Sequence, residues 1–197
     1  MTPRDVNALL GSRICHDLIS PLGAIGNGVE LLSLSGVRAE SELSLIARSV
    51  ESANTKIRFF RIAFGAASAD QLVSASEATN ILTEMSTDNR LSYVWKPKQD
   101  MPRQEVKLAF LLLQCLETAM PWGGRIVIDL IDDAWTILGT CERVKLDEAL
   151  WEMLRNPDQD ADVTASLVQF ALVQAAAEQA GRRIRTDLSP NEIRIAF

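Results

Sequence analysis

Histidine is nearly absent from this chain, which has one such residue, His16, among 197. A single imidazole cannot assemble a multi-histidine metal site or a relay of histidines that passes a proton along. It can still act alone as a carrier, because one ring nitrogen can hold a phosphoryl group and pass it on. A lone histidine is more often a surface residue or a satisfied core residue, so its position decides between these interpretations.

Paired cysteines and long apolar runs are also missing. The cysteines Cys15, Cys115 and Cys141 are far apart and odd in number, without the C-x-x-C spacing of a redox or zinc site. Disulfides are therefore not expected, which fits a reducing compartment. No apolar run reaches the roughly 18 residues of a membrane span, and the N-terminus lacks a signal pattern. These absences predict a cytoplasmic protein with no membrane partner.

Positive charge is in deficit, with a net charge of −6 at pH 7 and an isoelectric point of about 4.9. Nucleic-acid binding requires clustered lysine and arginine to neutralise phosphates. Nucleic acid is therefore not expected as a partner. The hydrophobic fraction of 47% is normal for a globular protein, and the length suits one large domain or two small ones.

Two helices are predicted over the first third of the chain. An apolar pattern at helical spacing runs to about Leu34, and a second helix is expected over 41–65. The apolar positions of the second helix alternate in steps of three and four: Leu43, Ile46, Val50, Ala53, Ile57, Phe60 and Phe64. Such a seam is typical of helices packed side by side. Two copies of this hairpin would close a four-helix bundle, so a homodimer is expected; a hairpin packed only on its own chain is the alternative.

The remainder of the chain mixes helices and strands. Helices are expected near 76–89, 103–120, 146–155 and 162–180, and strands near 91–96, 125–131, 135–142, 182–188 and 192–197. The predicted fold class is therefore α+β, with an N-terminal helical hairpin over 1–67. A C-terminal two-layer α/β sandwich with a mixed or antiparallel sheet follows over 75–197.

His16 lies on the polar face of the first predicted helix. At about 100° per residue, the apolar residues of this helix cluster within roughly 40° of one direction, and His16 falls about 160° away. The apolar stripe consists of Ile14, Leu18, Leu22, Ile25, Val29 and Leu32. The residues that share the face of His16 are small or polar: Ser12, Ser20, Gly23 and Asn27. The imidazole is therefore expected to project into solvent.

The residues next to His16 favour a partner-binding face over simple helix stability. Pro21 costs on the order of 3 kcal/mol in a helix interior and is expected to kink the helix. Three glycines follow and cost about 1 kcal/mol each relative to alanine: Gly23, Gly26 and Gly28. Asp17 either orients the imidazole and raises its basicity or is a solvated helix residue, and both interpretations stay open.

These residues carry a family resemblance. The run His16-Asp17-Leu18-Ile19-Ser20-Pro21-Leu22 resembles the H-box of two-component dimerisation and histidine-phosphotransfer domains. The longer run HDLISPLGAIGNGVELL, together with the residues 58–65, resembles the ChpT-like histidine phosphotransferases of alphaproteobacteria. The resemblance is specific over about 10–67. It implies a dimeric four-helix bundle joined to a degenerate kinase ATPase-like domain of the Bergerat type.

The resemblance also implies a role in a multistep phosphorelay that regulates the cell cycle. His16 would be the phosphoacceptor and Asp17 its orienting neighbour. The phosphoryl group would come from the receiver aspartate of a hybrid histidine kinase and pass to the receiver aspartates of response regulators. The Mg²⁺ is expected in the partner's receiver, so neither a metal nor a cofactor is expected here. The expected docking surface consists of Ser12, Arg13, Ser20, Gly23 and Asn27.

ATP binding is not expected. Kinases of this class carry an asparagine on the helix before the Gly-Gly turn, whereas residues 112–120 contain none. They also need glycine-rich loops around the phosphates, and between Arg125 and Gly181 the only glycine is Gly139, in a predicted strand. The chain is therefore expected to be a phosphotransferase without kinase activity. An ATP-dependent sensor histidine kinase core and a non-catalytic dimeric binding scaffold are the alternatives.

Overall fold

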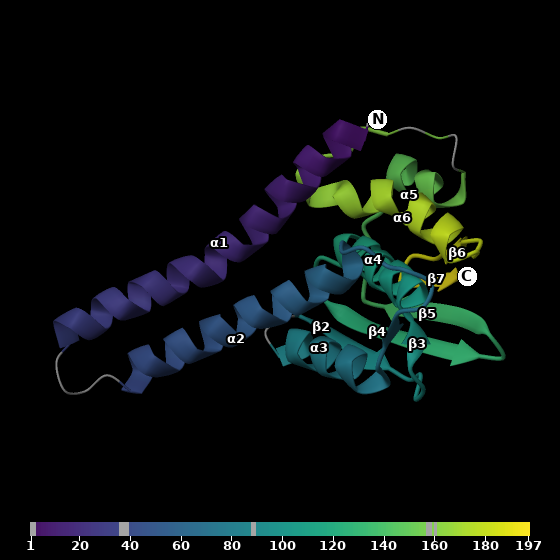
Figure 1. The fold of residues 1–197 in the computed structure, drawn as a ribbon. Coiled ribbons are helices and arrows are strands. Elements are labelled where there is room, and N and C mark those ends of the chain that lie inside the picture. Colours follow the sequence, from purple (N-terminus) through teal and green to yellow (C-terminus); the bar gives the residue numbers. More distant parts are fainter. Residues whose placement is uncertain (1–2, 36–39, 88–89, 157–158, 160) are drawn as a thin grey trace.

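Two long helices form the N-terminal part of the protein. The computed structural model describes residues 3–35, 40–87, 90–156, 159 and 161–197. Helix α1 spans Pro3–Ser35 and continues through Pro21, and α2 spans Glu40–Ala63. Figure 1 shows the two helices side by side and antiparallel, extending together away from the rest of the molecule. The predicted hairpin is confirmed.

Close approach of the two helices depends on Gly28. A Cβ atom added there would lie 2.5 Å from Cγ1 of Ile46 on α2, whereas a Cβ atom at Gly23 would meet no atom within 4 Å. Glycine at position 28 therefore lets the α1 backbone pass close to α2. Gly23 instead leaves an open surface on the outside of α1.

A five-stranded mixed sheet forms the centre of the C-terminal part. Its strands are β2 (Leu91–Trp95), β4 (Gly124–Ile131), β5 (Ala134–Thr140), β6 (Arg185–Leu188) and β7 (Glu192–Ala196). The spatial order is β2-β4-β5-β7-β6, with β2 parallel to β4 and the other neighbours antiparallel. The prediction left a mixed and an antiparallel sheet open, and the structure has the mixed one.

Helices pack against one face of this sheet. They are α3 (Ala75–Thr87), α4 (Arg103–Ala119), α5 (Glu148–Arg155) and α6 (Val168–Gln179). Buried residues alternate with exposed or half-buried ones along β2, β5 and β7, for example at Trp135 and Ile137 in β5. One covered face and one open face make a two-layer sandwich, so the predicted α+β class is confirmed.

Two local predictions differ from the structure. The helix expected over 162–180 begins later, at Val168, after the short 3₁₀ helix η1 (Ala165–Leu167). The hydroxyls of Thr164 and Ser166 lie 3.0 Å apart, and such local side-chain hydrogen bonds compete with a regular helix. The short strands β1 (Leu72–Val73) and β3 (Met101–Pro102) pair with each other. They were not predicted because two residues are too few to show alternation.

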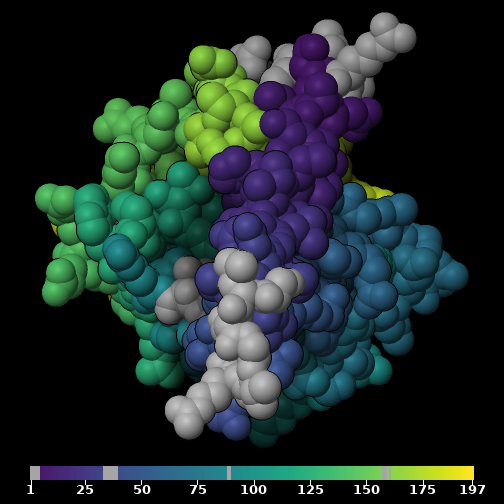
Figure 2. All heavy atoms as spheres, turned by 90° about the vertical axis from the view of Figure 1, so that its left-hand side faces the viewer, coloured from purple at the N-terminus to yellow at the C-terminus, as the bar shows by residue number. Residues whose placement is uncertain are grey.

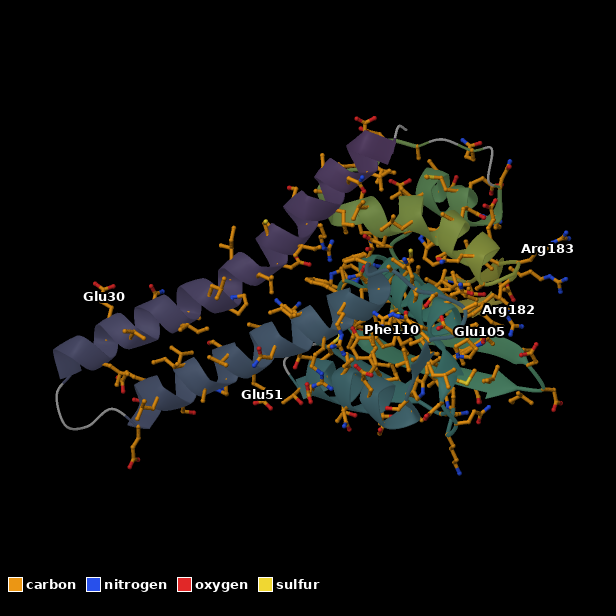
Figure 3. The ribbon with its side chains drawn as sticks, viewed as in Figure 1. Glu30, Glu51, Glu105, Phe110, Arg182 and Arg183 are labelled. Atoms are coloured by element: carbon orange, nitrogen blue, oxygen red, sulfur yellow. The ribbon has the colours of Figure 1, made fainter. Side chains whose placement is uncertain are left out.

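The hairpin and the α/β domain share one hydrophobic core. Phe59 of α2 stacks on Phe110 of α4 with ring centroids 4.7 Å apart, and Figure 3 shows Phe110 where α2 enters the domain. Leu9 and Ile14 of α1 pack against the same cluster. The burial of this apolar surface stabilises the hairpin against the domain. The side chains of α1 are thereby placed relative to α4 and α6.

Candidate functional site

His16 projects from α1 into solvent. Its side chain is 86% exposed, which confirms the orientation predicted from helical spacing. Figure 2 views the molecule from the side where α1 crosses its surface, with the first turns of α1 lying against α6. The imidazole is therefore accessible to another protein, although its helix is anchored to the domain.

Asp17 contacts the imidazole directly. Its Oδ1 lies 3.1 Å from Nδ1 of His16, and its side chain is only 20% exposed. This contact gives Nδ1 an acceptor, which favours the tautomer that carries its proton on Nδ1 and leaves the Nε2 lone pair free. Of the two interpretations left open for Asp17, the geometry favours the orienting neighbour over a fully solvated residue.

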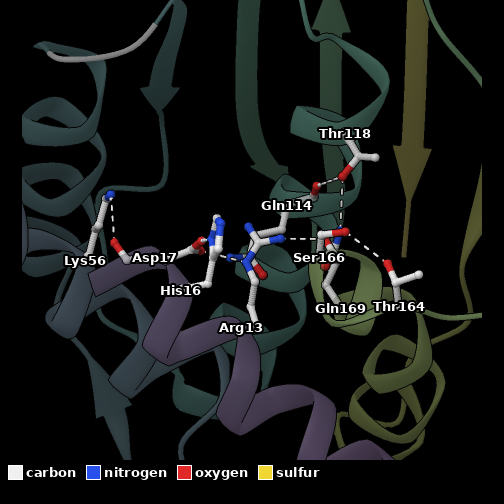
Figure 4. Close-up of polar contacts among 9 residues, drawn as sticks. All are labelled: Arg13, His16, Asp17, Lys56, Gln114, Thr118, Thr164, Ser166 and Gln169. Carbon is white, nitrogen blue, oxygen red and sulfur yellow. Dashed lines mark hydrogen bonds and ion pairs between the residues drawn. The ribbon is translucent and has the colours of Figure 1, made fainter. Parts of the chain in front are cut away.

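Arg13 holds the other oxygen of Asp17. Its Nε lies 2.6 Å from Oδ2 of Asp17, one helical turn further along α1. Its Nη1 also donates to the backbone carbonyl of Ser166 in η1. The sequence predicts Arg13 as a docking residue, yet its side chain is only 19% exposed and is engaged in these two contacts. Figure 4 shows the resulting connection from His16 through Asp17 and Arg13 to Ser166.

The remaining predicted docking residues lie at the surface of α1. All four are exposed, and they are Ser12, Ser20, Gly23 and Asn27. They occupy the same side of the helix as His16, because they are separated from it by four, seven or eleven positions. The structure therefore brings them together with the imidazole on one face.

A groove between α1 and α2 adjoins this face and was not predicted. Its volume is about 250 Å³, and it is lined by Ser20, Pro21, Ala24, Leu45, Arg48, Ser49, Ser52 and Lys56. Lys56 Nζ donates to the backbone carbonyl of Asp17 over 3.1 Å. The spacing of four between Arg48, Ser52 and Lys56 could have indicated one polar face on α2. The groove thus brings two cationic side chains of α2 within a few turns of His16.

A half-buried carboxyl group lies beneath α1. Glu117 of α4 accepts a hydrogen bond from the Tyr93 hydroxyl at 2.6 Å. Burial raises the pKa of Glu117 above its ordinary value; the Tyr93 hydrogen bond and the charge of Arg13 act in the opposite direction, and the charge of Asp17 raises it further. Glu117 is therefore electrostatically coupled to the pair that contacts His16.

Side chains of α4, α5 and α6 contact one another. Gln169 Nε2 donates to the Thr118 hydroxyl over 3.1 Å, and that hydroxyl donates to the carbonyl of Gln114 over 3.0 Å (Figure 4). Trp151 of α5 contacts the ring of Phe170 of α6 edge-on, with centroids 6.0 Å apart. Both rings are almost completely buried, so α5 packs tightly onto α6.

Neither a metal cluster nor a membrane span occurs in the part of the chain that the structure describes. Within those residues, no three histidine, cysteine, aspartate or glutamate side chains gather as metal ligands would. None of their helices combines the length and the apolar character needed to cross a bilayer.

The hairpin with its exposed imidazole, fixed to an α/β domain, defines the class of histidine phosphotransfer proteins. The family described as histidine phosphotransferase C-terminal domain matches residues 75–192. The chain is also 33% identical over 195 residues to Protein phosphotransferase ChpT of Brucella abortus (strain 2308), covering 96% of this chain and 93% of that protein. The chain therefore belongs to the ChpT-like histidine phosphotransferases, as the run HDLISPLGAIGNGVELL and the residues 58–65 predicted.

One solved structure shows the same relationship at the level of the fold. A structure described as a bacterial phosphotransferase superposes with a TM-score of 0.80 at 30% identity, covering 100% of this chain and 97% of that one. The histidine kinase domain of a blue-light activated kinase from Erythrobacter litoralis EL346 gives a TM-score of 0.46 at 12% identity, covering 98% and 91%. The first of these comparisons extends the family relationship over both the hairpin and the α/β domain.

Proposed function

We propose that His16 carries phosphoryl groups between receiver domains in a multistep phosphorelay. It would accept the group from the receiver aspartate of a hybrid histidine kinase and pass it to the aspartates of response regulators. The observation that supports this most strongly is the single imidazole of the chain, 86% exposed on an anchored helix, with Nδ1 turned towards Asp17. Nε2 is then the nitrogen that faces the incoming receiver.

The transfer is a displacement at phosphorus. The lone pair of Nε2 attacks the phosphorus of the acyl phosphate, an N–P bond forms, and the P–O bond to the donor aspartate breaks. The bonding electrons leave with the donor carboxylate, while Nδ1 keeps its proton directed at Asp17 Oδ1. In the second half-reaction the acceptor carboxylate attacks phosphorus, and the N–P electrons return to Nε2. Such transfers depend mainly on positioning and charge neutralisation, and the Mg²⁺ would be held by the receiver.

The docking face would include side chains from both helices. Ser12, Ser20, Gly23 and Asn27 supply a small, open surface on α1 beside the imidazole. Arg48 and Lys56 line the adjoining groove on α2. A receiver concentrates acidic residues around its phosphorylation site, so these cations complement it in charge and favour its approach.

A second copy of the chain would cover the opposite flank of the hairpin. A stripe of large apolar side chains there is between 41% and 67% exposed, and it consists of Ile19, Leu22, Val29, Leu43, Val50 and Ile57. Isolated chains rarely expose so many neighbouring apolar groups. The spacing of seven between Leu43, Val50 and Ile57 suits a four-helix bundle. His16 is offset from the α1 part of this stripe by roughly 100°, so dimerisation leaves the imidazole open.

The transfer would not use ATP. Gly139 does not form a phosphate loop, because it lies inside β5 and a Cβ atom there would come 2.8 Å from Sδ of Met120. Gln169 of α6 donates a hydrogen bond to Thr118 of α4, and Trp151 of α5 packs edge-on against Phe170 of α6. These observations favour a phosphotransferase over an ATP-dependent kinase core.

The test is phosphoryl acceptance from a radiolabelled phospho-receiver. We expect acid-labile, alkali-stable label on the wild type and none on His16→Ala, because the chain offers no second histidine. In a parallel arm with labelled ATP alone, both proteins are expected to stay unlabelled. Equal labelling of both variants by the phospho-receiver would reject His16 as the carrier, and labelling of the wild type by ATP would favour the kinase alternative.

A further inference from the structure

Arg13 joins the acidic neighbour of His16 to the α/β domain. Its guanidinium uses two different nitrogens: Nε contacts Oδ2 of Asp17 at 2.6 Å, and Nη1 donates to the carbonyl of Ser166. A guanidinium is planar and presents its donors in a fixed geometry. The two contacts therefore fix the orientation of the Arg13 guanidinium relative to the Asp17 carboxylate.

The position of Asp17 Oδ1 depends on this contact. The two carboxylate oxygens are rigidly linked, so binding of Oδ2 by Arg13 directs Oδ1 towards Nδ1 of His16 at 3.1 Å. Lys56 does not replace this function, because its Nζ bonds the backbone carbonyl of Asp17 and not the carboxylate. Without Arg13, the carboxylate would be free to rotate away from the imidazole.

The second point of attachment lies far along the chain. Ser166 belongs to η1, which leads directly into α6, and α6 packs on α4 in the core. The Ser166 hydroxyl is in turn 3.0 Å from that of Thr164. Figure 4 shows Arg13 between α1 and this segment. The α/β domain therefore contributes to the arrangement of the groups around His16.

We propose that Arg13 is a positioning residue for phosphotransfer, which holds the Asp17 carboxylate towards Nδ1 of His16 by fastening it to η1. The proposal rests on the proposed function of His16. It differs from a docking role, in which the guanidinium would face the receiver. Two inward contacts and a side chain that is 19% exposed favour positioning.

The test is the rate of phosphoryl acceptance measured against the concentration of phospho-receiver. For Arg13→Ala we expect a maximal rate roughly tenfold lower with an unchanged half-saturating concentration, because misorientation slows the chemical step. Arg13→Lys is expected to recover part of the rate, since its single ammonium can reach Asp17 but cannot reproduce the two-point geometry. The double variant Arg13→Ala/Asp17→Asn should be no slower than Asp17→Asn alone.

Arg58→Ala is the matched control for general loosening of the helices. Arg58 and Glu84 form an ion pair between α2 and α3 at 2.9 Å, with side chains 35% and 32% exposed. This variant is expected to keep the wild-type kinetics. A raised half-saturating concentration in Arg13→Ala, an unchanged maximal rate, or an equal loss in Arg58→Ala would overturn the positioning role. Failure of the wild type itself to accept label would instead overturn the proposed function together with this inference.

Discussion

At the scale of single residues, the site depends on how one carboxylate is shared. Asp17 gives one oxygen to His16 and the other to Arg13, and Glu117 lies below them on α4 with a raised pKa. The periodicity of α1 predicted the exposure of His16, because a helix angle follows from position alone. It could not predict the inward turn of Arg13, because the carbonyl that binds it belongs to Ser166, 153 positions away.

The raised pKa of Glu117 predicts a pH-dependent contribution to stability. The folded protein binds this proton more tightly than the unfolded chain does, so stability falls as the pH rises through the ordinary value of 4.5 and the carboxyl ionises. Glu117→Gln stays neutral and keeps an oxygen that can accept from Tyr93. We therefore expect its unfolding free energy, relative to wild type, to increase between about pH 4 and about pH 8.

Urea denaturation of both proteins at several pH values measures this difference. Tyr93→Phe serves as the companion variant, since it removes the hydrogen bond that opposes the effect of burial. A difference between Glu117→Gln and wild type that stays constant with pH would show that Glu117 has no shifted ionisation in the fold.

At the scale of elements, α1 packs against α2 on one side and presents an open docking surface on the other. The sequence predicted both roles from Pro21 and the glycines, but not which glycine serves which purpose. Gly28 faces Ile46 at close range, whereas Gly23 faces open space. That distinction depends on how α1 packs against α2, which a single-helix pattern does not contain. For the same reason, the groove residues Arg48 and Lys56 could not be predicted from the pattern of one helix.

Alanine substitutions at Gly23 and Gly28 are expected to have opposite effects on the stability of the protein. Both gain roughly 1 kcal/mol of helix propensity, so the comparison isolates packing. Gly28→Ala should be about 1–3 kcal/mol less stable than Gly23→Ala, because its Cβ collides with the Ile46 side chain and forces the helices apart. Thermal and chemical unfolding of the two variants provides the measurement. Equal stability would contradict the close approach at Gly28.

The apolar stripe of α2 makes a prediction about assembly. Val50→Glu places a charge in the middle of the stripe, where a second copy would bury it at a large cost. We expect the wild type to have twice the 21.7 kDa mass of one chain and Val50→Glu to be monomeric by light scattering. Ser44→Glu, at an exposed polar position of the same helix, should remain dimeric. A monomeric wild type would contradict the bundle.

At the scale of the whole molecule, a shared hydrophobic core joins the hairpin to the α/β domain. The alternation of helices and strands predicted the two parts and their approximate elements. It did not reveal that Phe59 of α2 stacks on Phe110 within the core of the α/β domain. The periodicity of one helix does not show which residues of another helix it contacts. This shared core and the Arg13 contact to η1 explain how the α/β domain can support a histidine on another element.

The most direct measurement follows label through a mixture of three proteins. A labelled phospho-receiver, this chain and a second receiver that does not exchange with the first are combined, and label on the second receiver is recorded over time. The account predicts transfer to the second receiver with the wild-type chain and retention on the first with His16→Ala. Equal transfer with His16→Ala would contradict the claim that His16 carries the phosphoryl group.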